Sequence, residues 1–281
     1  MKVIVVKDYQ AMSDLAAEII ANTIKANPSC TLGLATGSSP IGTYQNLVKD
    51  VKAGEISFKD VKTYNLDEYC GISRSHPQSY YYFMHDNLFN HVDIDEANVH
   101  IPAVSNDHLE EDCKTYNDML HNATIDLQLL GIGGNGHIGF NEPGTSFASG
   151  THLAELSEST IEANSRFFNG NEEVPKTAIT MGIKSINDAK AVILLAYGQA
   201  KAEAIAATVD GPVTEEVPAS SLQNHPNAFV ITREDKLQFV DSTNTWIDVL
   251  TKYTGRKYSK DGKYSYVQEK IINHIKWDER R

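Results

Sequence analysis

An imidazole and a carboxylate follow a glycine-rich turn in the stretch LLGIGGNGHIGFNEP, residues 129–143. His137 has a side chain that titrates near neutral pH, and Glu142 carries a carboxylate that can orient its ring. Four glycines between positions 131 and 136 allow positive φ and a close approach of the backbone to a ligand. The stretch therefore predicts a proton-transfer site, and the remaining site residues must face this loop.

The same glycines also satisfy G-x-G-x-x-G, the pattern of dinucleotide-binding loops. That pattern holds a pyrophosphate at the N-terminus of a helix that begins directly after the third glycine. Here the segment HIGFNEPG follows, and its two glycines and one proline interrupt any such helix. The match also falls late in the chain, so we do not expect a nicotinamide site.

An anion site is predicted at Gly37, Ser38 and Ser39, which lie between a predicted strand and a predicted helix. Free backbone N–H groups of the first helical turn and two hydroxyl groups converge there at the positive end of the helix dipole. An ordinary turn with a serine cap is the alternative interpretation. The loop is not a Walker A motif, because no Gly-Lys-Ser/Thr follows.

Three charged residues are candidates for the same site. Asp67 follows a predicted strand, and ligands of open α/β sheets bind beyond the carboxyl ends of strands; a loop acid that caps the next helix is the alternative. Lys201 stands in the first turn of a predicted helix, against the dipole preference, which indicates an anion there unless it is a solvated surface lysine. Arg166 is the only arginine between positions 74 and 233.

Strands and helices alternate along the first 235 residues, which indicates one parallel sheet covered by helices. Predicted strands span 2–6, 31–35, 61–66, 99–101, 125–132, 152–156, 177–181, 191–197 and 228–232, and predicted helices span 11–26, 40–52, 78–89, 106–121, 182–187 and 198–209. The basic, tyrosine-rich remainder contains two possible helices, 243–253 and 266–277. We therefore expect a main domain, 1–240, and a C-terminal extension, 241–281, whose role the sequence leaves open.

Bulk properties exclude several classes of protein. A hydrophobic content of 41% and a charged content of 22% are typical of a soluble globular protein. The net charge of −12 argues against nucleic acid and anionic membranes as partners. We expect a cytoplasmic location, because no signal peptide or membrane span is recognisable and the three cysteines show no pairing pattern. No HExxH or clustered Cys/His spacing is present, so neither a metal nor another cofactor is expected.

Six motifs in order make the chain resemble the glucosamine-6-phosphate deaminases, over residues 1 to about 240. They are TGSSP (36–40), NLDEY (65–69), HPQSYYYFM (76–84), GGNGHIGFNEP (133–143), ANSRFF (163–168) and GQAKAEA (198–204). The 6-phosphogluconolactonases have a related fold, but FNEP after GHIGF resembles the deaminases. The resemblance implies an α/β fold, with a modified Rossmann-like parallel sheet, helices on both faces and a single domain.

The resemblance also implies a reaction, in which glucosamine 6-phosphate and water become fructose 6-phosphate and ammonia by ring opening, aldose–ketose isomerisation and deamination. It places the phosphate on Gly37, Ser38 and Ser39, with Arg166 and Lys201 as its cationic partners. A guanidinium and an ammonium together suit a phosphate dianion.

The resemblance further assigns the catalytic groups. His137 exchanges the protons of ring opening, Glu142 holds its ring, and Asp67 takes the C2 proton. Asn135 replaces an aspartate of many family members, and we expect its amide to hydrogen-bond the imidazole without supplying a charge. An Asn135→Asp change is then expected to shift the acid limb of the pH–rate profile.

A second departure concerns allostery. Family members activated by N-acetylglucosamine 6-phosphate bind it through Arg, Lys and Thr, at positions that here hold His152, Ala154 and Glu155. We therefore expect a monomer or small homo-oligomer rather than the allosteric hexamer. Alternatives for the whole chain are a 6-phosphogluconolactonase-like hydrolase and a sugar-phosphate-sensing module. The latter is disfavoured because no DNA-binding pattern accompanies it.

Overall fold

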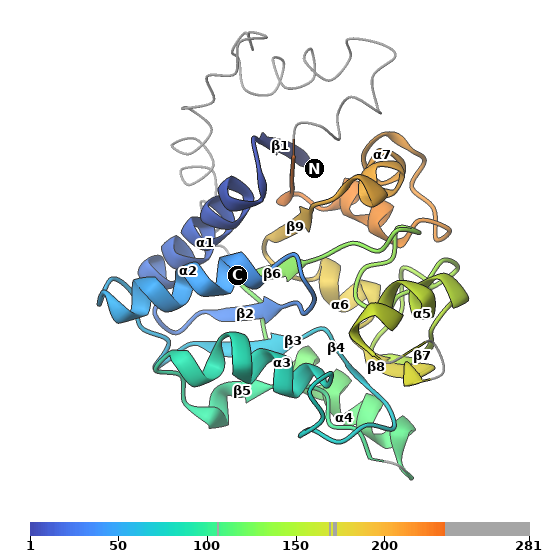
Figure 1. Cartoon of the computed structure of the whole chain (residues 1–281), viewed down its shortest axis with the longest axis horizontal. Helices are drawn as coiled ribbons and strands as arrows, with labels where there is room; N and C mark the ends of the chain where they lie inside the picture. The colour runs from blue at the N-terminus through green and yellow to red at the C-terminus, as the bar shows by residue number, and fades with distance from the viewer. Residues whose placement is uncertain (106, 169, 171–172, 234–281) are drawn as a thin grey trace, which may run out of the picture.

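The structure is a computed structural model that describes residues 1–105, 107–168, 170 and 173–233 (Figure 1). The expected C-terminal extension, 241–281, and its two possible helices lie outside the described residues. The fold of the described part belongs to the α/β class, as predicted, with a mostly parallel central sheet surrounded by helices.

Seven strands form the large sheet in the order β1-β10-β9-β6-β2-β3-β5, and every neighbouring pair is parallel. These strands are β1 (Lys2–Val6), β2 (Thr31–Leu34), β3 (Lys62–Asn65), β5 (Val99–His100), β6 (Leu127–Leu130), β9 (Val192–Ala196) and β10 (Ala228–Arg233). All residues of β2, β6 and β9 are buried. Such strands are mostly apolar because both faces of the sheet are covered.

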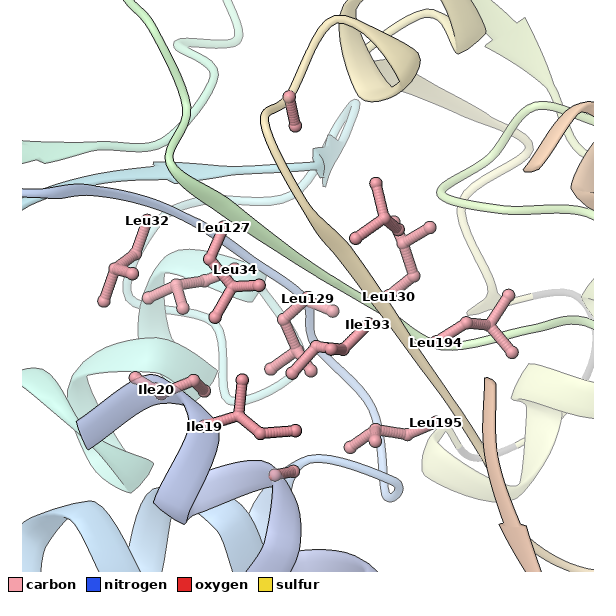
Figure 2. Packing of buried hydrophobic residues seen from close by; sticks show 14 of the residues in the cluster. Ile19, Ile20, Leu32, Leu34, Leu127, Leu129, Leu130, Ile193, Leu194 and Leu195 are labelled. Atoms are coloured by element: carbon pink, nitrogen blue, oxygen red, sulfur yellow. The ribbon is translucent and has the colours of Figure 1, made fainter. Parts of the chain in front are cut away.

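The helices that cover the sheet are α1 (Tyr9–Ala26), α2 (Ile41–Lys52), α3 (Tyr80–Asn87), α4 (Leu109–His121), α5 (Glu158–Asn164), α6 (Ile183–Asn187) and α7 (Ala202–Asp210). Figure 2 shows Ile19 and Ile20 of α1 facing side chains of β2, β6 and β9. Leu129 and Leu130 are both buried and, as neighbours in a strand, point to opposite faces. Helices therefore cover both faces, as predicted.

The helix starts follow local chemistry. Asp8 caps α1, because its Oδ1 accepts the backbone N–H of Ala11 at 2.8 Å. Short 3₁₀ helices, which the sequence analysis did not predict, are η1 (Phe89–His91), η2 (Glu96–Asn98), η3 (Ser165–Phe167), η5 (Gln199–Lys201) and η6 (Pro218–Asn224). The predicted helix 198–209 is thus divided into η5 and α7.

The prediction of a single sheet is wrong for the predicted strands 152–156 and 177–181, which pair with a short strand that was not predicted. Strands β4 (Asp67–Tyr69), β7 (His152–Glu155) and β8 (Thr177–Thr180) form a separate antiparallel sheet in the order β4-β8-β7. The two sheets meet at Leu66, whose N–H donates to Leu34 of the large sheet and whose C=O accepts from Met181 beside the small one. A hydrophobic pattern identifies a strand but does not specify which sheet it joins.

The strand order reverses between β2 and β6. From β2 the chain proceeds to β3 and β5 on one side, whereas from β6 it proceeds to β9 and β10 on the other. Open α/β sheets bind ligands at such a point, outside the carboxyl ends of the strands. The loops after β2, β3, β6 and β9 therefore meet at one edge of the sheet, and these loops carry most of the predicted site residues.

Candidate active site

The loop after β6 folds into a tight turn that presents His137. Gly133 donates its N–H to the C=O of His137 at 2.9 Å, and Gly136 has a φ of 87°. A Cβ added to Gly133 would lie 2.3–2.5 Å from three ring atoms of His137, so only glycine lets the imidazole lie against this backbone. The next element after this turn is the strand β7 (His152–Glu155), so the helix that the dinucleotide pattern requires does not directly follow Gly136.

His137, Glu142 and Asn135 form a connected polar group. His137 Nδ1 lies 3.4 Å from Glu142 Oε2, and Asn135 Nδ2 donates to the same carboxylate oxygen at 2.7 Å. The expected bond from the Asn135 amide to the imidazole is wrong. Its Oδ1 instead accepts the backbone N–H of His137 at 3.2 Å, so Asn135 holds the turn and the carboxylate together.

Glu142 is strongly stabilised as an anion. Burial raises its pKa, but the hydrogen bond and charge of His137, together with hydrogen bonds from Thr160 and Asn135, outweigh that effect and lower the pKa to about 2. A carboxylate that stays ionised favours a proton on the facing Nδ1, which leaves Nε2 of the imidazole for exchange with a ligand.

Asp67 begins β4 and lies against the same loop. A Cβ placed on Gly139 would stand 3.5 Å from Asp67 Oδ2, and only 6% of the residue is exposed. Burial, and secondly the neighbouring Glu68 carboxylate, raise the pKa of Asp67 well above its usual range. A buried carboxylate of this kind is a stronger base than a solvated aspartate.

Glu68 points away from Asp67 into the start of α3. Its carboxylate accepts the backbone N–H groups of Tyr69, Tyr80 and Tyr81 at 2.8–2.9 Å. Burial raises the pKa of Glu68, while these three bonds and the charge of Arg74 oppose the rise. Glu68 therefore fixes β4 to α3 and supplies the like charge that acts on Asp67.

The predicted anion loop follows β2. Gly37 adopts a φ of 97°, and a Cβ there would meet nothing within 4 Å, so the backbone faces open space. Ser38 and Ser39 follow, and α2 then begins at Ile41, with Pro40 at its cap position and no hydrogen bond from a capping side chain. The alternative interpretation, an ordinary turn with a serine cap, requires a serine hydroxyl to cap α2. No serine side chain does so here.

Two cations, Lys201 and Arg166, lie close enough for their charges to interact. Lys201 ends η5 and precedes α7, and Arg166 lies in η3. Burial lowers the pKa of Lys201, and the charge of Arg166 lowers it further. The carbonyl oxygen of Ala200 lies 3.9 Å from where a Cβ of Gly134 would stand, which brings the Lys201 segment beside the His137 turn. An anion between the two cations would relieve their repulsion.

Some contributors were missed by the sequence analysis. Asn164 Nδ2 donates to the Tyr69 hydroxyl at 2.9 Å and so ties the Arg166 segment to β4. Thr160 Oγ1 lies 3.4 Å from His137 Nδ1. The tyrosine cluster after position 79 does pack, as predicted, with the rings of Tyr69 and Tyr80 4.8 Å apart. The Tyr69 hydroxyl contact joins residues that are distant in sequence, so no local pattern predicts it.

A family model described as glucosamine-6-phosphate isomerases/6-phosphogluconolactonase matches residues 7–231. The chain belongs to this family. Within it, the chain is 52% identical over 241 residues to a glucosamine-6-phosphate deaminase of Thermoanaerobacter pseudethanolicus, covering 85% of this chain and 95% of that protein. It is 51% identical over 234 residues to glucosamine-6-phosphate deaminase 2 of Bacillus subtilis, covering 82% and 94%.

Solved structures of the family agree with the fold. A monomeric glucosamine-6-phosphate deaminase superposes with a TM-score of 0.83 at 43% identity, covering 86% of this chain and 100% of that one. A 6-phosphogluconolactonase from Trypanosoma brucei superposes with a TM-score of 0.68 at 18% identity, covering 85% and 98%, and this similarity bears on the fold alone. No helix in the described part of the chain combines the length and apolar character that a membrane crossing needs.

Proposed function

We propose that this protein is a glucosamine-6-phosphate deaminase, which converts glucosamine 6-phosphate and water into fructose 6-phosphate and ammonia. One observation carries the proposal: the loop that holds the His137–Glu142 pair lies against buried Asp67 and beside the segment of Lys201, whose charge interacts with that of Arg166. Identities of about 50% to deaminases over most of the chain support the same reaction.

The phosphate group is held at the end of the loop 37–39. The hydroxyl groups of Ser38 and Ser39 and the free N–H groups of the loop donate to its oxygens, at the positive end of α2. Arg166 and Lys201 neutralise its two charges, which compensates the burial that depresses the Lys201 pKa. The sugar then extends from this anchor toward the turn that carries the imidazole.

Ring opening is the first chemical step and uses His137. The imidazole accepts the proton of the O1 hydroxyl and donates a proton to O5 as the C1–O5 bond breaks, so the imidazole is restored. Glu142, ionised over the whole working range because its pKa is about 2, stabilises the transient imidazolium. Asn135 donates a hydrogen bond to Glu142 and keeps the carboxylate in place.

Isomerisation and deamination follow at C1 and C2. Asp67 takes the C2 proton while the aldehyde oxygen gains the proton that the substrate's C2 ammonium group gives up, which leaves an enolamine with a neutral amine. Asp67 then returns its proton to C1 and leaves an iminium at C2. Water adds to this carbon, and the C–N bond breaks to release ammonia and the ketone. The raised pKa of Asp67 suits both halves of this transfer, and such general-base steps contribute about 10²- to 10⁴-fold in rate.

The same proposal extends to assembly and location. Ala154 is buried in β7 and Glu155 brings a negative charge to the position next to it, so this strand is a poor binding surface for a phosphorylated effector. We therefore propose a monomer or small homo-oligomer in the cytoplasm, without activation by N-acetylglucosamine 6-phosphate. The monomeric state of the deaminase with the TM-score of 0.83 supports this assignment.

The test is an assay of ammonia and fructose 6-phosphate with wild-type protein and Asp67→Asn. We expect equal amounts of both products from the wild type and a loss of at least 10²-fold in the variant. A hydrolase of the lactonase type would instead consume a 6-phosphogluconolactone and release no ammonia. Sigmoidal kinetics relieved by N-acetylglucosamine 6-phosphate would contradict the proposal on assembly.

A further inference from the structure

We propose that Tyr9 is a positioning residue that holds the anion loop in its binding conformation and thereby sets the affinity for the phosphate group. The proposal rests on the anion-binding role given above to residues 37–39. The Tyr9 hydroxyl donates to the C=O of Ser38 at 3.0 Å and accepts the N–H of Gly42 at 2.9 Å. We call these two hydrogen bonds the Tyr9 bridge; it spans the loop from its entry to the first turn of α2.

The start of α2 explains why an outside group is needed. Helices leave their first N–H groups without partners inside the helix, and a capping side chain usually satisfies one of them. Pro40 stands at the cap position of α2 and supplies no such side chain. Tyr9 belongs to a different helix, α1, yet it satisfies the Gly42 donor and fixes the Ser38 carbonyl at the same time.

The fit between the two helices is close. A Cβ added to Gly42 would lie 2.4 Å from Ser13 Oγ and 3.1 Å from a ring carbon of Tyr9. Position 42 must therefore lack a side chain for the hydroxyl of Tyr9 to reach its N–H. Gly42 and Tyr9 act as a matched pair, since the bridge requires both.

Tyr9 also contacts the end of the strand that leads to Lys201. Its ring packs edge-on against Tyr197, with centroids 5.1 Å apart and an interplanar angle of 62°. Tyr197 directly follows β9, and the chain reaches Lys201 within the next turn. One side chain therefore contacts both the serine loop and the segment that carries the lysine, which are far apart in sequence.

A simple packing role for the ring is the competing explanation, and two variants separate the roles. Tyr9→Phe keeps the ring and removes the bridge, whereas Tyr9→Leu removes both. Under the proposal, both variants bind inorganic phosphate about tenfold more weakly in calorimetry, because two hydrogen bonds of ordinary strength are lost. In steady-state kinetics KM rises by a similar factor and kcat stays within about twofold, since the acid–base groups are untouched.

Tyr82→Phe serves as the matched control, because Tyr82 is 41% exposed and lies in α3. It should bind phosphate as the wild type does. Unchanged phosphate affinity in Tyr9→Phe, or a fall in kcat with constant KM, would overturn the proposal. If wild-type protein binds no phosphate, the loop that the Tyr9 bridge holds is not a phosphate site, and the proposal fails. If it binds phosphate but releases no ammonia, the proposed reaction is wrong while the variants still decide the role of Tyr9.

Discussion

Replacing Asp67 with asparagine should stop turnover and, at the same time, stabilise the fold. The residue is 6% exposed, and burial followed by the Glu68 charge raises its pKa well above the usual value. A carboxyl group of this kind contributes stability while protonated, and that stability is lost as pH rises through the raised pKa of the folded state. At neutral or alkaline pH, ionised Asp67 therefore costs folding free energy that asparagine does not.

The magnitude follows from linkage. Each unit by which the pKa of Asp67 is raised corresponds to about 1.4 kcal/mol, and each kcal/mol moves the thermal midpoint by roughly 2–4 °C in proteins somewhat smaller than this one. An increase of several degrees at pH 8 is thus expected for Asp67→Asn. At pH 4 the gap between variant and wild type should narrow, because the wild-type carboxyl group is then largely protonated in the folded state and partly protonated in the unfolded state.

The chain provides a matched control in Asp126, which is also 6% exposed. Its carboxylate accepts the N–H of Thr31 at 2.8 Å and the ammonium of Lys190 at 2.9 Å. Asp126→Asn should therefore lower the free energy of unfolding by about 1.5–3 kcal/mol, because charged hydrogen bonds are lost. Its thermal midpoint at pH 8 should fall accordingly. Thermal unfolding of the three proteins at both pH values is the measurement. A lower midpoint for Asp67→Asn at pH 8 would refute the burial argument.

Further substitutions test neighbouring parts of the site. Glu68→Gln removes the like charge that raises the Asp67 pKa, so the acid limb of kcat/KM should move to lower pH; a limb displaced upward would contradict this. Asn135→Asp places a second carboxylate 2.7 Å from Glu142, which should raise the Glu142 pKa from about 2 and move the acid limb upward, and an unmoved limb would contradict the assigned contact. Lys201→Met should raise KM about 10- to 100-fold with little change in kcat, as steady-state kinetics would measure. Gly133→Ala should lower kcat by about 10²-fold, because its methyl group meets the His137 ring; near-normal kcat would show that the ring can move without loss.

The sequence predicted the fold class and most element positions, because fully apolar strands and amphipathic helices are local patterns. The strand–loop junctions at positions 37–39 and 131–142 were also predictable from turn chemistry. The small antiparallel sheet could not be predicted, because the chain passes from one sheet to the other at Leu66 through backbone hydrogen bonds to residues 34 and 181. Pattern analysis also gave no indication of the Tyr9 bridge, whose partners lie 29 and 33 residues away.

The proposed site residues belong to two sheets that are joined at Leu66, whose N–H and C=O are hydrogen-bonded to residues 34 and 181. Asp67 begins the small sheet, whereas the serine loop and Lys201 extend from the large one. In the proposed reaction the substrate must reach from the carboxylate to the cations, so this spacing measures the length of the sugar. We expect an amino-sugar phosphate one carbon shorter to be a poorer substrate, because discrimination by chain length would then depend on the placement of the two sheets rather than on any single side chain.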